Sequence, residues 1–222
     1  GYLSMSSPLK TVKGISPPKA SDLFVIDNTA YYRYGNKMVE LKVHDQNNNI
    51  MVSTKQTWNI MSNSKIYAGI VVQNMLGNIH LTMPVPNPSG KSACYTISIP
   101  ELEGFKIFDA KYSKGVAVVS GQYNNDYKLL VFRFDSNHTK YDVREILCDG
   151  PEESNFVVLD NNVVVMIPKD GYLEAFGNKP FSSSSIKSIN DPIITTDMKL
   201  TKDGVKVLFF KGKKLYSISM KN

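Results

Sequence analysis

The stretch that decides the fold is residues 156–176, which read FVVLDNNVVVMIPKDGYLEAF. Three runs rich in β-branched and aromatic side chains are separated by short groups of Asp, Asn and Gly. Such runs form strands, and Asp-Asn and Asp-Gly pairs form the tight turns of hairpins. The stretch therefore predicts three antiparallel strands joined by two turns.

The same pattern recurs along the chain. Residues 22–43 and 198–220 copy the order strand, turn, strand, turn, strand, and two looser copies cover residues 64–83 and 113–134. The intervals between first turns are 36, 51, 46 and 43 residues when these turns are placed at Asn28, Ser64, Gly115, Asn161 and Gly204. The longest interval contains the proline-rich residues 84–91, which predict an exposed loop.

A repeat of about 44 residues with three or four short strands is typical of a β-propeller blade. Over residues 21–222 the chain resembles the WD40-like and kelch-like propellers in period and pattern, although their Gly-His, Trp-Asp and Gly-Gly signatures are absent. The repeat predicts an all-β fold, a small β-propeller of about five blades with three to four antiparallel strands each. A β-sandwich is the alternative, because its strands also recur every ~8–12 residues.

The repeats begin after residue 20, so we expect residues 21–222 to form the propeller domain. Residues 1–20 contain Pro8, Pro17 and Pro18 with little periodicity, which indicates an N-terminal tail or linker. An open ring would expose sheet edges, so this segment is also a candidate to donate a closing strand to the last blade.

The positive charge lies at the two ends of the chain. Of the net charge of +6, residues 1–20 carry +3, residues 197–222 carry +5 and the remainder carries −2. Lysine supplies most of this charge, which suits diffuse attraction to an acidic partner better than base-specific reading of nucleic acid. The candidate partner-binding residues are therefore four lysines and one exposed member of the aromatic cluster at residues 31–34: Lys206, Lys211, Lys213, Lys214 and Tyr31.

Motifs that carry chemistry are absent from the sequence. His44, His80 and His138 lie far apart without the spacing of metal ligands, and there is no phosphate-binding loop or nucleophile elbow. Carboxylates at Glu101, Glu103 and elsewhere indicate a solvated surface. We therefore expect no catalytic, cofactor-binding or metal-binding residues.

These observations predict a non-enzymatic protein–protein interaction module, a propeller scaffold that presents loops to a partner in a larger assembly. One alternative is a carbohydrate-binding or glycoside-processing propeller, which needs carboxylates and aromatic rings at the axis. Another is non-specific nucleic-acid binding through a lysine-rich face. No apolar run approaches the roughly 18 residues of a membrane helix, so we expect no membrane partner. Reduced thiols at Cys94 and Cys148 would suit an intracellular setting, cytoplasmic or nuclear.

Overall fold

The structure, a computed structural model, describes residues 23–26, 29–46, 49–87 and 89–148. Beyond residue 148 it describes only the backbones of the strands given below. Side chains are described for residues 23–26, 29–42, 53–87 and 89–148.

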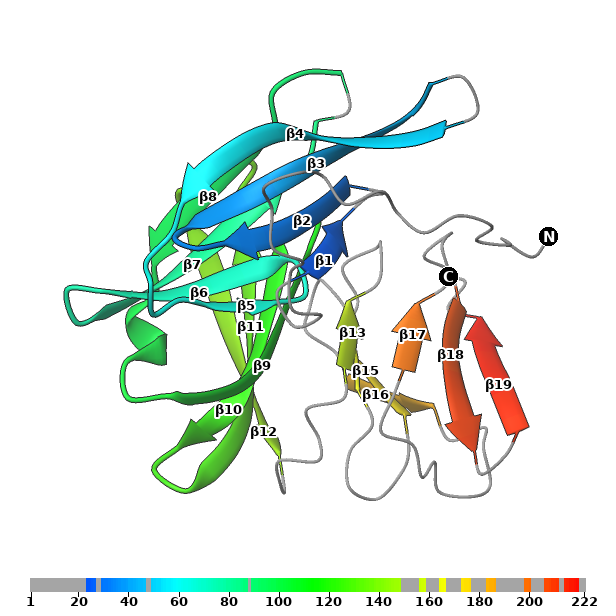
Figure 1. Ribbon diagram of the computed structural model, residues 1–222. Coiled ribbons are helices and arrows are strands. Elements are labelled where there is room, and N and C mark those ends of the chain that lie inside the picture. Colours follow the sequence, from blue (N-terminus) through cyan, green and yellow to red (C-terminus); the bar gives the residue numbers. More distant parts are fainter. Residues whose placement is uncertain are drawn as a thin grey trace.

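In the described part of the chain, the strands form five antiparallel sheets, and within each sheet they follow their order in the sequence (Figure 1). The first sheet contains β1 (Leu23–Ile26), β2 (Thr29–Tyr34), β3 (Lys37–Gln46) and β4 (Asn49–Asn59). The second contains β5 (Lys65–Tyr67), β6 (Ile70–Met75), β7 (Asn78–Val85) and β8 (Ala93–Ser98). After the short 3-10 helix η2 (Pro100–Leu102), the third contains β9 (Lys106–Ser113), β10 (Val116–Tyr123), β11 (Asp126–Phe134) and β12 (Tyr141–Cys148). The fourth contains β13 (Phe156–Val158), β14 (Val164–Met166), β15 (Leu173–Phe176) and β16 (Ser183–Ile186), and the fifth contains β17 (Met198–Leu200), β18 (Lys206–Lys211) and β19 (Lys214–Ser219).

From the second sheet to the fifth, successive sheets contact each other through their first strands. β5 contacts β9, β9 contacts β13, and β13 contacts β17. The prediction of an all-β chain in antiparallel units of three or four strands is confirmed. A sandwich consists of two face-packed sheets, so five sheets do not fit that alternative. Within the described part of the chain, no helix is long and apolar enough to cross a membrane.

The first turn of the second sheet lies later than the sequence predicts. Ser64 belongs to the link between β4 and β5, whereas residues 68–69 join β5 to β6. Gly69 has φ +80°, and a Cβ at this position would lie 2.6 Å from the carbonyl oxygen of Tyr112 on β9. Glycine is therefore required here by close packing between sheets as well as by the turn.

This correction makes the repeat more regular than the predicted turn positions suggested. Gly69 lies 41 residues after Asn28 and 46 residues before Gly115, in place of 36 and 51 with Ser64. Asn28, Asn161 and Gly204 themselves lie outside the described residues.

The predicted proline-rich loop begins later as well. Pro84 is buried within β7 and pairs with Cys94 of β8. On the other side of β7 the ladder with β6 runs only as far as Thr82, so the missing N–H of Pro84 breaks no hydrogen bond there. Cys94 and Cys148 are half-buried thiols that form no disulfide with each other.

Two apolar clusters join neighbouring sheets. The first unites Tyr31 and Met38 of the first sheet with Val71 of the second. The second unites Leu81 of the second sheet with Phe132 of the third. The first six residues of β10 are all buried, because this strand is covered on both faces of its sheet. Each of the first three sheets thus depends on a neighbour for burial, as expected for stacked repeats.

The alternating strand directions give the sheets two distinct ends. One end carries the turns between second and third strands (residues 35–36, 76–77 and 124–125) and the links between sheets (residues 60–64 and 99–105); we call it the hairpin face. The β6–β7 turn and η2 both lie at the left of Figure 1. The opposite face carries the other turns (residues 68–69, 86–92, 114–115 and 135–140).

Candidate functional site

Large exposed apolar side chains gather on the hairpin face. Seven such side chains are exposed among those described: Leu23, Val25, Tyr34, Met61, Leu76, Tyr123 and Leu147. Six of them belong to the hairpin face. Met61 and Leu76 lie in its link and turn, and the others, except Val25, lie within one residue of a strand end at this face. Scattered exposed apolar residues are ordinary, but concentration at one end of a molecule is typical of an interaction surface.

Leu76 is the most exposed of this group. It occupies the β6–β7 turn with φ 55°, followed by Gly77 with φ 92°. Two positive φ values define the turn that favours Asn-Gly, and a leucine in this conformation costs about 1 kcal/mol. The Asn74 side chain supports the turn by accepting a hydrogen bond from the Gly77 amide at 3.1 Å. The leucine is thus placed in water, in a backbone conformation that disfavours it.

The equivalent turns of the neighbouring sheets use residues suited to that conformation. In the first sheet, Gly35 takes the position equivalent to Leu76 with φ 56°, and in the third sheet Asn124 and Asn125 form the turn with φ 48° and 72°. Leu76 therefore departs from a rule that both neighbouring turns follow.

A cavity of about 380 Å³ opens beside η2, on the hairpin-face side of the third sheet. Its apolar wall contains Phe105 and Leu130, both nearly buried, and the half-buried Val143. Gly121 on β10 makes room for this wall, because a Cβ there would lie 2.3 Å from the Phe105 ring and 2.4 Å from the Lys106 carbonyl oxygen. The register shift between Ser120 and Gly121 marks the same close approach.

The polar rim of the cavity is predominantly acidic. Glu101, Glu103 and Glu145 line it together with one ammonium group, that of Lys128. The Lys128 Nζ lies 3.0 Å from Glu145 Oε1 and 5.8 Å from the centre of the Tyr123 ring, which also lines the cavity.

Tyr141, which does not line the cavity, holds the Glu101 carboxylate through a hydrogen bond. The Tyr141 hydroxyl donates to Glu101 Oε2 at 2.7 Å. Burial, and then this contact with Glu101, raises the pKa of Tyr141 far above its ordinary value, so the hydroxyl stays a donor at neutral pH. The Glu103 amide donates to the Pro100 carbonyl at 3.0 Å, but its carboxylate forms no hydrogen bond or ion pair within the described part of the chain.

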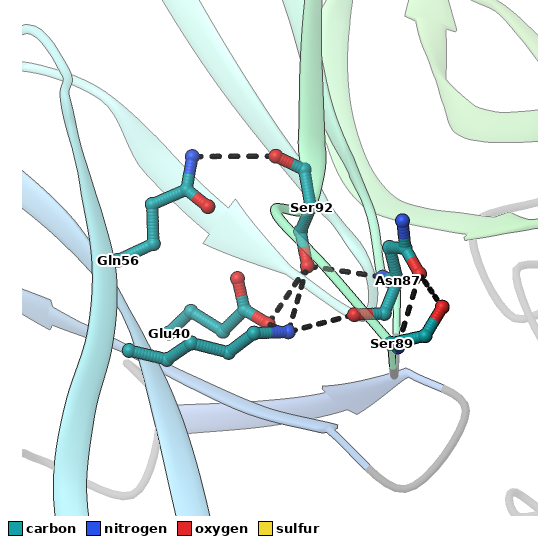
Figure 2. Close-up of polar contacts among 6 residues, drawn as sticks. Glu40, Gln56, Asn87, Ser89 and Ser92 are labelled. Carbon is teal, nitrogen blue, oxygen red and sulfur yellow. Dashed lines mark hydrogen bonds and ion pairs between the residues drawn. The ribbon is translucent and has the colours of Figure 1, made fainter.

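A second polar cluster, drawn in Figure 2, joins the first sheet to the loop between β7 and β8. Glu40 on β3 is fully buried, and its Oε1 accepts from Lys55 Nζ at 2.9 Å and from Ser92 Oγ at 2.8 Å. Lys55 also donates to the Asn87 carbonyl at 2.8 Å, and the Gln56 amide donates to the Ser92 carbonyl at 3.2 Å. The cluster is a bridge between sheets, and it holds the loop that the sequence predicted to be merely exposed.

An aromatic cluster around His138 forms a comparable bridge between the second and third sheets. The His138 ring stacks on Tyr95 of β8 with ring centres 4.3 Å apart, and its Nε2 lies 2.6 Å from the Tyr112 hydroxyl. Burial lowers the pKa of His138. This effect is larger than the two that raise the pKa, a hydrogen bond with the Ser136 backbone and the charge of Asp135. Within the described ranges, no three His, Cys, Asp or Glu side chains are grouped to hold a metal ion.

Tyr31, predicted to contact a partner, is in the core. Its side chain is fully buried, stacked on Phe24 with ring centres 5.2 Å apart and 6.2 Å from Trp58. The prediction for Tyr31 is wrong, because both faces of β2 are covered: Tyr32 is buried too, and Tyr34 is the exposed member of this cluster.

Lys211 and Lys214 flank the β18–β19 turn of the fifth sheet, whereas Lys206 lies at the other end of this ladder, paired with Ser219. Lys206 and Lys211 are the first and last residues of β18, and Lys211 pairs with Lys214 of β19. This hairpin joins the second and third strands of its sheet, the position that the Leu76 turn has in the second sheet. Lys213 lies outside the described residues, as do residues 1–20, so the charged surface and the closing strand stay predictions.

Sequence reasoning missed both the Leu76 turn and the cavity. A leucine before a glycine in a hairpin turn was a usable local signal. The cavity left no local signal, because Glu101 and Glu145 are far apart in sequence and meet only through the fold. It is built by β11, β12 and η2 rather than by the first strands, so it is not the axial pocket expected of a sugar-binding propeller.

Comparison with known proteins gives no family for this chain. No family model matches it, including those of the WD40-like and kelch-like repeats, and no curated protein matches. Among solved structures, the crystal structure of the N-terminal domain of Nup159 matches with a TM-score of 0.43 and 13% sequence identity. The match covers 92% of this chain and 60% of that one, and a likeness this distant supports no functional argument.

Proposed function

We propose that this chain is a non-enzymatic protein-binding module that holds its partner on the hairpin face. The observation that carries the proposal is the placement of the exposed large apolar side chains, six of seven on that face. Apolar side chains that cluster on one surface bury favourable area when a partner covers them.

The proposed architecture is a small propeller with five blades, one for each sheet. Its support is the sheet order and the contacts between successive first strands. Rigid stacked sheets of this kind hold their turns in fixed positions, and turns on a rigid scaffold are common binding elements.

Leu76 provides the sharpest test of the binding face. The variant Leu76→Asn removes the apolar side chain while its replacement tolerates the positive φ, so stability should be unchanged or raised by about 1 kcal/mol. We expect a partner captured by the wild-type protein from a cell extract of its source to bind at least about tenfold more weakly, as for an interface anchor. Titration calorimetry with the purified partner measures this change.

The matched control is Lys114→Asn, in the β9–β10 turn. Lys114 also has a positive φ, of 45°, but it lies on the opposite face. This variant should bind the partner like the wild-type protein. Equal affinity of the Leu76→Asn variant, or a loss confined to Lys114→Asn, would contradict the proposed face.

A further inference from the structure

We infer that the cavity beside η2 receives a basic side chain of the bound partner, with arginine the best fit. The inference rests on the proposed function, because it places the cavity within the partner-binding face. It adds the chemistry of the partner: a segment that presents a positive charge, not the acidic segment that the lysine-rich ends of the chain suggested.

The shape and lining of the cavity suit a long side chain with a charged end. Phe105, Leu130 and Val143 form an apolar wall, and the carboxylates lie on the rim. Lysine and arginine bury their methylene stems along apolar surface while their charged ends remain near water and counter-charges. A purely apolar ligand would leave the carboxylates without compensation, and an acidic one would be repelled.

The charge of the rim favours a cation. The lining contains three carboxylates and one ammonium group, so its formal charge is −2. Glu145 is already paired with Lys128, and Tyr141 fixes Glu101 in place. The Glu103 carboxylate has no hydrogen bond or ion pair in the described part of the chain, and it is therefore the carboxylate best able to bind an incoming cation.

Lys128 shows within the structure how this rim binds a cation. Its ammonium group lies between a carboxylate, at 3.0 Å, and an aromatic ring, at 5.8 Å. Attraction of a cation to both kinds of group is well established for such distances. A guanidinium group has the further advantages that it stacks on rings and donates to carboxylates in one plane.

The test uses two short peptides that differ only in charge. The full chain, labelled with ¹⁵N, is titrated with acetyl-Ala-Arg-Ala-amide and with the same peptide carrying citrulline, the neutral isostere of arginine. We expect millimolar binding of the arginine peptide, with amide shifts at Tyr123, Lys128 and Glu145. The citrulline peptide should bind about fivefold more weakly, and 200 mM salt should weaken the arginine peptide further.

Two charge-neutralising variants localise the effect. Glu103→Gln should weaken the arginine peptide about two- to threefold. Asp142→Asn, which removes an exposed carboxylate of β12 that does not line the cavity, should leave its affinity unchanged. Equal binding of both peptides, shifts outside the cavity, or an equal effect of the two variants would overturn the inference.

The Leu76→Asn variant separates this inference from the proposed function. Leu76 does not line the cavity, so this variant should bind the arginine peptide normally. If the partner depends on Leu76 but the peptide does not bind, only the inference about the cavity fails. If the peptide binds but the partner binds the Leu76→Asn variant as tightly as the wild-type protein, the proposed binding face fails.

Discussion

Glu40 is a fully buried carboxylate, and its charge is compensated chiefly by Lys55. The Lys55→Met variant keeps the methylene stem and removes the ammonium group, so a buried charge is left with Ser92 alone. We expect the free energy of unfolding to fall by about 3 kcal/mol, the scale of a broken buried pair. Urea unfolding measures this loss.

The double variant Lys55→Met with Glu40→Gln provides the control. It removes both charges, and should therefore recover a large part of the lost stability. A loss below about 0.5 kcal/mol in the single variant, typical of surface positions, would mean that the cluster in Figure 2 does not bridge the sheets.

His138 makes the bridge between the second and third sheets sensitive to acid. Its pKa is lower in the folded protein than the ordinary 6.5, so the unfolded chain holds more protons between these two values. Stability is then full above pH 6.5 and falls as the pH decreases through this window, levelling off below the folded pKa. Urea unfolding at pH 7.5 and pH 5.0 should show this loss.

The His138→Asn variant tolerates the positive φ of this position and does not titrate. It should be less stable at pH 7.5, because the ring contacts are lost, but its stability should depend less on pH. The role assigned to His138 would be wrong if the variant and the wild-type protein lost equal stability between the two pH values. Asp135, whose pKa is lowered mainly by the Lys140 amide, acts in a more acidic range.

At the scale of the strands, the sequence predicted most of what is local. Alternation of apolar and polar residues, with Asn, Asp and Gly between runs, identified the hairpins of the first and third sheets. The turn at residues 68–69 was misplaced because its need for glycine arises from packing against Tyr112, which local patterns do not report. Tyr31 was misassigned for a related reason, since a strand covered on both faces shows no exposed side.

The cavity lies beyond prediction from local patterns. Its wall depends on Gly121 admitting the Phe105 ring, and its rim depends on the pairing of β11 with β12, which places Lys128 near Glu145. Taken by itself in the sequence, each residue of the cavity wall and rim is typical of an ordinary surface or core position. Only the arrangement of η2 against the third sheet brings these carboxylates and apolar side chains together in one cavity.

At the scale of the whole molecule, the regular sheet order separates two faces with different surfaces. The hairpin face combines exposed apolar side chains with an acidic cavity, whereas the turns of the opposite face carry the Asn87 and His138 bridges. Polar contacts also join neighbouring segments on the hairpin face, where Arg33 donates to the Ser62 and Ser64 carbonyls. The exposed apolar side chains are the reason that we propose the hairpin face for binding.

Hydrogen–deuterium exchange of the protein with and without its captured partner tests this division most directly. We predict slower amide exchange on binding in the hairpin-face segments, residues 74–78, 99–105 and 123–126. Exchange should be unchanged in the opposite-face segments, residues 86–92, 113–116 and 135–140. Protection confined to the opposite-face segments would contradict the assignment of the hairpin face as the binding surface.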